Sequence, residues 1–299
     1  MEMLAIHGLH KRFGDKKVLC GLDLTVPEGS IFGFIGKNGA GKTTAMMAVL
    51  GLTRPDSGEI LVHGEPVRYG GTKTNRFIGY LPDVPAFYPH LTAREYLRFC
   101  GEVSGMERGE IALRSDELLA LVGLGSEKHR IGGYSRGMKQ RLGIAQALLS
   151  RPSLLICDEP TSALDVVGRR EILDILLAVR EQTTVLFSTH ILSDVERICT
   201  DIALLDRGRI ALRGSLSEVR SAYRTEEYAI ETETRASLAA IASAFPSMRE
   251  EKEGVLTFTE RQCAPGEVLR FIAKQEIALV RFERTEPTLE KLFMEVTGA

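Results

Sequence analysis

The 299-residue sequence is poor in features that mark several classes of protein. It has only five cysteines, an odd number without Cys-x-x-Cys spacing, which argues against a zinc site or a disulfide framework and indicates a reducing cytosol. No apolar run approaches the roughly 20 residues needed to span a bilayer, and the first residues lack the apolar core of a signal peptide. Any role at a membrane is therefore expected to depend on a separate partner.

Charge and composition set further limits. The net charge is −2, so no overall basic field is expected to recruit nucleic acid, and the six histidines form no ligand cluster. Hydrophobic residues make up 44% of the chain, which is ordinary for a globular protein. This length and composition allow one large domain with a proper core and one small domain.

The most informative stretch is a glycine-rich loop between an expected strand and an expected helix. It fits the pattern G-x-x-x-x-G-K-[ST] and consists of Gly36, Lys37, Asn38, Gly39, Ala40, Gly41, Lys42, Thr43 and Thr44. Residues 30–35 indicate a buried strand that enters the loop, and residues 44–50 indicate a helix whose positive end faces bound phosphates. The glycines let backbone N–H groups surround phosphate oxygens, while Lys42 reaches the β- and γ-phosphates and the Thr43 hydroxyl binds Mg²⁺.

Two adjacent carboxylates follow a second apolar strand. Residues 154–157 lead directly into Asp158 and Glu159, which places both acids at the C-terminal end of a buried parallel strand, where α/β sheets bind ligands. A strand followed by an acidic turn has the same pattern. The phosphate loop upstream favours the functional interpretation, because Mg²⁺–nucleotide needs a carboxylate from a neighbouring strand.

Three other signals are weak in isolation. Ser135 and Gly137 precede a helix with an apolar stripe and predict a second anion site at its N-terminus, although an ordinary N-cap has the same pattern. Phe13 lies at a turn and could either stack on a flat ring such as adenine or cap the sheet. His190 follows a strand at residues 184–188, where a lone histidine is usually structural.

The order of the elements predicts an α/β protein with two domains. Residues 1–220 form the larger domain, with an antiparallel β-pair at its start and a helical insertion at about residues 84–150. Residues 221–299 alternate strands and helices, which suggests a small α+β unit of the split βαβ kind. The charged run 249–253 is expected to be a solvated loop in that unit.

In this order, the phosphate loop, helical insertion, Ser-x-Gly helix, Asp-Glu strand and late histidine resemble the ATP-binding subunit of an ABC transporter over about residues 1–220. The resemblance implies a P-loop NTPase core with an antiparallel β subdomain and a helical insertion, and it implies ATP and Mg²⁺ as ligands. It also implies that Phe13 stacks on adenine and that Asp158 holds Mg²⁺ through water. The resemblance further implies catalytic roles for Lys42, Glu159 and His190, with Glu159 polarising the attacking water and His190 contacting the γ-phosphate.

The same resemblance implies that one chain carries two half-sites. Ser135 and Gly137 resemble the family signature, which binds ATP held by the opposite subunit. Asp165 belongs to a segment, residues 162–165, that crosses the dimer interface in the family. A second ATP-binding subunit is therefore expected, most simply a second copy of this chain.

The sequence departs from the family pattern at two motifs. The signature is usually Leu-Ser-Gly-Gly-Gln, whereas this chain has Tyr134-Ser135-Arg136-Gly137-Met138. Asp83 stands where a glutamine normally links the nucleotide to the membrane partner. A carboxylate at residue 83 could still meet the nucleotide's Mg²⁺ or a water, but it cannot donate the hydrogen bonds of an amide unless it is protonated.

These variants and the ending from Glu286 to Met294 are similar to a branch of exporters, including antibiotic exporters, whose ATPase and permease are separate chains. We therefore expect an ATPase that powers export through an integral membrane permease, with no nucleic-acid partner and a location on the cytoplasmic face of the membrane. The alternatives are a soluble ABC ATPase acting on ribosomes or DNA and a non-hydrolysing nucleotide sensor. The C-terminal unit either stabilises the dimer or only packs.

Overall fold

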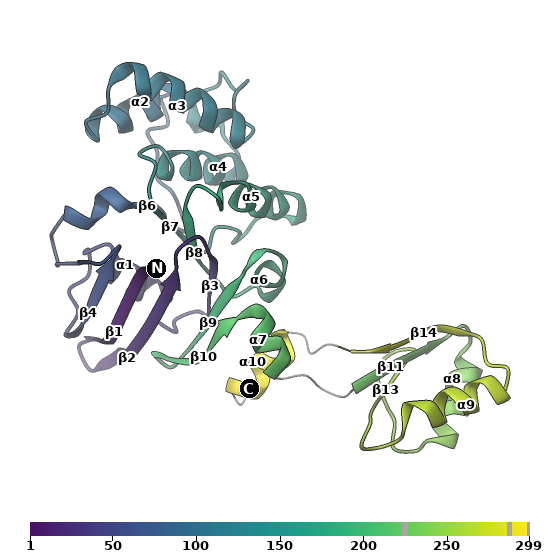
Figure 1. Ribbon diagram of the computed structural model, residues 1–299. Helices are drawn as coiled ribbons and strands as arrows, with labels where there is room; N and C mark the ends of the chain where they lie inside the picture. Colours follow the sequence, from purple (N-terminus) through teal and green to yellow (C-terminus); the bar gives the residue numbers. More distant parts are fainter. Residues whose placement is uncertain (223–226, 286–288, 298–299) are drawn as a thin grey trace. The chain divides into compact units, whose positions relative to one another are not determined.

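The computed structural model describes residues 1–222, 227–285 and 289–297 (Figure 1). The chain divides into two compact units, Met1–Leu216 and Ser217–Ala299. The two units are described separately below.

A four-stranded antiparallel sheet begins the first unit. Its order is β2-β1-β4-β5, and its strands are β1 (Glu2–Phe13), β2 (Lys16–Pro27), β4 (Ser57–Val62) and β5 (Glu65–Pro66). Four consecutive apolar residues of β1, Met3 to Ile6, and alternate residues of β2 from Leu22 to Val26 are buried, and most of them pack in one core with α1 (Lys42–Val49). The two-residue turn Gly14-Asp15 joins β1 to β2, and Gly14 has φ 57°, which glycine adopts without strain.

A six-stranded sheet forms the centre of the first unit. Its order is β10-β9-β3-β8-β7-β6, with β6 (Ile78–Leu81), β7 (Leu154–Asp158), β8 (Thr184–Thr189), β3 (Ile31–Ile35) and β9 (Asp201–Asp206) parallel and β10 (Arg209–Ser215) antiparallel to β9. Every residue of β3, β7 and β8 is buried, as expected for central parallel strands. Because β3, β8 and β7 are parallel neighbours, their carboxyl ends lie at the same edge of the sheet.

Besides α1, the helices of the first unit are α2 (Ala93–Val103), α3 (Arg108–Leu121), α4 (Arg136–Ala147), α5 (Val166–Val179) and α6 (Leu192–Ile198), with 3₁₀ turns η1 (Lys73–Phe77) and η2 (Ile131–Gly133). Helix α7 (Leu216–Ala222) starts at the last residue of this unit, and its other residues belong to the second unit. Figure 1 shows α2, α3 and α4 gathered in the teal part of the first unit. A capping box starts α2, because Thr92 Oγ1 accepts from the backbone N–H of Glu95 and the Glu95 carboxylate accepts from that of Thr92.

The second unit has its own core. Its sheet order is β12-β13-β11-β14, with antiparallel neighbours throughout, and its elements are β11 (Glu227–Thr232), α8 (Arg235–Ala244), β12 (Arg249–Lys252), β13 (Val255–Thr259), α9 (Pro265–Lys274), β14 (Leu279–Arg284) and α10 (Leu289–Thr297). Ile230, Leu256 and Phe258 of the sheet pack with Leu238 and Ile241 of α8. This chain order and sheet order form a split βαβ unit.

The predicted fold class is confirmed, with one correction to an individual element. Residues 249–252, expected to lie in a loop, form the edge strand β12, because their backbone pairs with β13. The first three residues of the exporter-like ending, 286–288, lie outside the described residues.

Candidate active site

A cavity of about 500 Å³ opens where the phosphate loop meets the carboxyl ends of β7 and β8. It gathers most of the side chains that the sequence singled out. Its lining includes Phe13, Asn38, Gly39, Gly41, Lys42, Thr43, Thr44, Asp83, Asp158, Glu159 and His190. Lys37, Gly36 and Ala40 belong to the same loop but are not among the lining residues.

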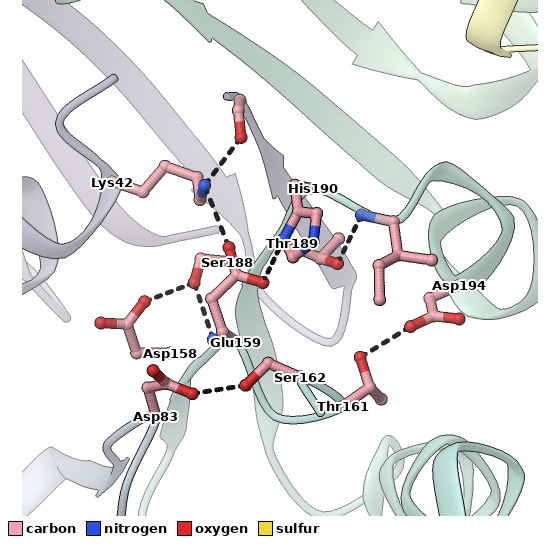
Figure 2. A network of polar contacts seen from close by, with 12 residues as sticks. Lys42, Asp83, Asp158, Glu159, Thr161, Ser162, Ser188, Thr189, His190 and Asp194 are labelled. Carbon is pink, nitrogen blue, oxygen red and sulfur yellow. Dashed lines mark hydrogen bonds and ion pairs between the residues drawn. The ribbon is translucent and has the colours of Figure 1, made fainter. Parts of the chain in front are cut away.

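The phosphate loop holds its lysine in a defined position. Gly39 and Gly41 have φ of 82° and 113°, backbone conformations that only glycine adopts readily, and they turn the chain into α1. Lys42 is 6% exposed, and its Nζ donates to the Gly36 carbonyl oxygen at 2.7 Å. The same Nζ lies 3.0 Å from Glu159 Oε1, so the cation and this acid form an ion pair at the cavity wall (Figure 2).

Asp158 is fixed by two hydroxyl groups. Thr43 Oγ1 donates to Asp158 Oδ2 at 2.7 Å, and Ser188 Oγ donates to Asp158 Oδ1 at 2.6 Å. Ser188 lies opposite Asp158 in the register of β7 and β8. A threonine hydroxyl and a carboxylate side by side are oxygen donors of the kind that Mg²⁺ prefers.

Glu159 lies at the centre of the polar network that Figure 2 draws. Its φ is 47°, so the chain turns sharply after β7, and its backbone N–H donates to Ser188 Oγ at 2.9 Å. His190 Nδ1 lies 2.9 Å from Glu159 Oε2. Because an ionised carboxylate can only accept, Nδ1 carries the hydrogen of this bond. Glu159 Oε1 is buried, and among the described residues it has no hydrogen-bond partner besides its ion pair with Lys42.

Phe13 stands at the end of β1 with 54% of its surface exposed, so it does not cap the sheet as a buried aromatic would. Lys11 Nζ lies 5.0 Å from its ring centroid. Asp56 holds this strand end, because its Oδ2 accepts from the backbone N–H of Arg12 at 2.7 Å. That bond lowers the pKa of the Asp56 carboxyl. An exposed ring at a cavity edge suits stacking on a planar ligand.

Three further predicted site residues, which lie outside the phosphate loop, do not line the cavity. Ser135 is the N-cap of α4, where its hydroxyl accepts from the backbone N–H of Met138 at 3.2 Å, and Gly137 lies in the first turn. Asp165 is the N-cap of α5, and its Oδ1 accepts from the backbone N–H of Gly168 at 2.8 Å. Ser135 and Asp165 thus cap helices, and none of the three is among the described residues that line the cavity.

Sequence reasoning missed Ser188. Its only signal was a polar residue at the end of an apolar strand, two residues before His190. The structure shows that it is fully buried and joins the carboxylate of Asp158 to the backbone of Glu159. Ser188 therefore orients both acids at once.

We expect Ser188→Ala to lower the free energy of unfolding by about 1–3 kcal/mol, because it leaves two buried polar groups without their partner. The same change should slow the expected hydrolysis of ATP, because Asp158 and Glu159 each lose a hydrogen bond to the Ser188 hydroxyl. Urea unfolding and phosphate release measure the two effects. Ser126→Ala is the matched control, because Ser126 is exposed. Equal stability of the two variants would contradict the bridging role.

Comparison with known proteins identifies the family. A family profile described as "ABC transporter" matches residues 19–162, and one described as "ATP-binding protein DrrA1-3-like, C-terminal domain" matches residues 214–297. The chain is 36% identical to the uncharacterized ABC transporter ATP-binding protein YxlF of Bacillus subtilis (strain 168), over 99% of this chain and all of that protein. The chain belongs to the ATP-binding proteins of ABC transporters.

Two further relatives carry functional names. This chain is 33% identical to the bacitracin transport ATP-binding protein BcrA of Bacillus licheniformis, over 97% of this chain and 95% of that protein. It is 32% identical to the linearmycin resistance ATP-binding protein LnrL of Bacillus subtilis (strain 168), over 99% and 98% of the two chains. These names belong to the antibiotic-export branch that the sequence resembles.

Solved structures agree with the fold. An ATP-binding subunit of an ABC transporter is 31% identical and has a TM-score of 0.67, covering 74% of this chain and 93% of that one. A cassette solved as a dimer in a post-hydrolysis state with ADP and phosphate is 25% identical and has a TM-score of 0.65, covering 72% and 99% of the two chains. This ABC ATPase binds and hydrolyses ATP, and subunits of its kind work with membrane permeases. Among the described residues, no helix is long and apolar enough to cross a membrane.

Proposed function

We propose that this ABC ATPase powers export of an antimicrobial compound through a separate permease, at the cytoplasmic face of the membrane. The observation that carries the proposal is the convergence of Lys42, Asp158, Glu159 and His190 on one cavity in a chain whose full-length relatives are named for bacitracin transport and linearmycin resistance. No nucleic-acid partner is proposed, in keeping with the net charge of −2.

The proposed chemistry is in-line attack of water on the γ-phosphorus of ATP. Glu159 Oε1 takes the proton as the new P–O bond forms, and the bond to the β-phosphate oxygen breaks, which releases ADP and phosphate. His190 donates to Glu159 Oε2 and so fixes the orientation of the carboxylate. Lys42 neutralises developing charge on the phosphates, and Phe13 stacks on adenine. The backbone N–H groups of residues 36–44 surround the phosphates.

The residues present fit Mg²⁺. Thr43 Oγ1 and Asp158 Oδ2 lie 2.7 Å apart at the cavity, and Asp83 supplies another carboxylate to its lining. In our proposal Thr43 and Asp158 hold the ion, directly or through water. When bound, the ion neutralises phosphate charge and orients the nucleotide for attack.

A second ATP-binding subunit completes the proposed site. Ser135, Gly137 and Asp165 stand outside the cavity, so this arrangement leaves the anion-binding N-terminus of α4 available to ATP held by another copy. We propose a homodimer in which ATP binds the closed state preferentially and hydrolysis removes that preference. The C-terminal unit, whose residues 214–297 match the profile of a DrrA1-3-like C-terminal domain, either stabilises this dimer or only packs.

Trapping experiments test the partner. A Glu159→Gln protein is loaded with ATP in its native cells, solubilised gently and analysed by mass spectrometry. We expect a polytopic membrane protein to co-purify, and a Lys42→Ala protein, which binds ATP poorly, to retain less of it. Recovery of ribosomal or DNA-repair proteins instead would contradict the exporter proposal. A wild-type turnover equal to that of Lys42→Ala would support a nucleotide sensor.

A further inference from the structure

One face of α4 runs along the segment of residues 79–85. The face carries Arg136, Gln140, Gly143 and Ala147 at helical spacing. A Cβ added at Gly143 would lie 2.5 Å from Leu81 Cδ1, and one added at Gly79 would lie 2.1 Å from the Ala147 carbonyl oxygen. The helix and the segment are therefore in close contact, with backbone against backbone at Gly79.

Asp83 is attached to the start of this helix face at two points. Gln140, which is 1% exposed, donates from Nε2 to the Asp83 carbonyl oxygen at 3.2 Å. Arg136, one helical turn earlier, places its Nη2 3.6 Å from Asp83 Oδ1. Both the backbone and the side chain of residue 83 are thus held by α4.

Asp83 and Arg136 also share a third partner, Ser162. The Ser162 hydroxyl donates to Asp83 Oδ1 (Figure 2), and Arg136 Nη2 donates to the Ser162 hydroxyl oxygen at 3.3 Å. Ser162 closes the turn that begins at Glu159, because its backbone N–H donates to the Glu159 carbonyl oxygen at 3.0 Å. A contact at Ser162 therefore constrains the residue that we propose to polarise water.

We propose that Arg136 and Asp83 form a matched charge pair that positions the turn from Glu159 to Ser162, and that each residue requires the other. The inference rests on the proposed function. Both residues are departures from the family pattern, which has glycine and glutamine at these two places, and the structure brings the two departures into contact. Both are positioning residues, since they act on hydrolysis through Ser162.

Electrostatics and geometry contribute separately to this pair. The two side chains are 47% and 49% exposed, so their mutual attraction alone contributes little to stability. Asp83 lines the cavity, however, and an unpaired carboxylate there repels a triphosphate. The guanidinium cancels that charge, and it also holds the Ser162 hydroxyl in place.

These two contributions predict distinct kinetic signatures in a double-mutant cycle with Asp83→Asn and Arg136→Gln. Arg136→Gln should raise the KM for ATP about fivefold, because Asp83 loses its counter-charge, whereas Asp83→Asn should leave KM unchanged or lower. The double variant should return KM to the wild-type value. The value of kcat should fall about fivefold in all three, because Arg136→Gln removes the guanidinium from Ser162 and Asp83→Asn leaves the Ser162 hydroxyl a weaker, uncharged acceptor. The loss in the double variant should not exceed the larger single loss.

Conservative and matched variants sharpen the test. Arg136→Lys keeps the positive charge but loses the planar guanidinium with its several N–H donors. Compared with Arg136→Gln, it should therefore have the wild-type KM for ATP and only a partly restored kcat. Arg170→Gln removes an arginine that is 72% exposed on α5 and pairs with a surface aspartate, and it should change neither constant. A KM increase that persists in the double variant would overturn the proposal, because Arg136 would then act on the nucleotide without Asp83.

A second measurement separates this inference from the proposed function. Hydrogen exchange of the backbone amides at residues 161–164 should accelerate in Arg136→Gln and in Asp83→Asn, and no further in the double variant. This readout needs no turnover. If the wild-type protein did not hydrolyse ATP, the proposed function would be wrong. The hydrogen-exchange rates would still test whether Arg136 and Asp83 act as a pair. Accelerations that simply multiply in the double variant, or exchange that does not change, would overturn the pair.

Discussion

Replacing Glu159 with glutamine should slow ATP hydrolysis by about 10²- to 10⁴-fold, the range that a positioned general base contributes. The amide has nearly the same shape as the carboxylate, but it cannot take the proton of the attacking water. The backbone N–H of residue 159 still donates to Ser188, so the turn should keep its form. ATP binding should survive, because Gly36 still holds Lys42 through its carbonyl oxygen.

Phosphate release under saturating ATP measures the first effect, and the affinity for a fluorescent ATP analogue measures the second. Glu181→Gln is the control, because Glu181 is an exposed acid in the loop between α5 and β8. Near-normal hydrolysis by Glu159→Gln would remove Glu159 from the chemistry. A parallel loss of binding would instead mean that the residue supports the cavity.

The phosphate loop and the two acids could be predicted because their signal is local. Nine consecutive residues specify the loop, and a short apolar strand specifies where Asp158 and Glu159 must lie. The parallel sheet then brings the two stretches together without further information, since carboxyl ends of adjacent parallel strands meet at one edge. His190 follows from the same geometry, at the end of β8.

Contacts between distant segments could not be predicted in this way. Ser188 is an ordinary strand residue in the sequence, and only the register of β7 against β8 places it beside Asp158. The contact of Arg136 with Asp83 joins residues 53 positions apart and depends on how α4 packs along β6. A deviation from a motif is visible in one sequence, but its compensating partner is not.

The edge strand β12 shows a different limit. Its residues, Arg249 to Lys252, have a composition typical of a solvated loop, and pairing with β13 overrides that preference. Charged side chains on an edge strand also discourage pairing with other chains. The sequence therefore predicts the split βαβ type of the unit but not its fourth strand, β12.

Gly79→Ala should lower the free energy of unfolding of the first unit by at least about 3 kcal/mol, at the upper end of what overpacking usually causes. The new Cβ would lie 2.1 Å from the Ala147 carbonyl oxygen and 3.0 Å from Pro152 Cγ. Both atoms belong to backbone or to a rigid ring, so the end of α4 has to move away from β6. The same movement draws Gln140 and Arg136 away from Asp83, and kcat should therefore fall as well.

Urea unfolding tests this packing against a control with the same chemistry. Gly109 lies in the first turn of α3, where an added Cβ would meet nothing within 4 Å. Gly109→Ala should therefore be neutral or stabilising by up to about 1 kcal/mol, because alanine restricts the unfolded chain more than glycine does. Opposite signs for the two substitutions would show that contact with α4, and not helix or strand propensity, requires glycine at residue 79. A Gly79→Ala protein of wild-type stability would mean that α4 and β6 lie further apart, and it would weaken the argument that α4 controls the position of Asp83.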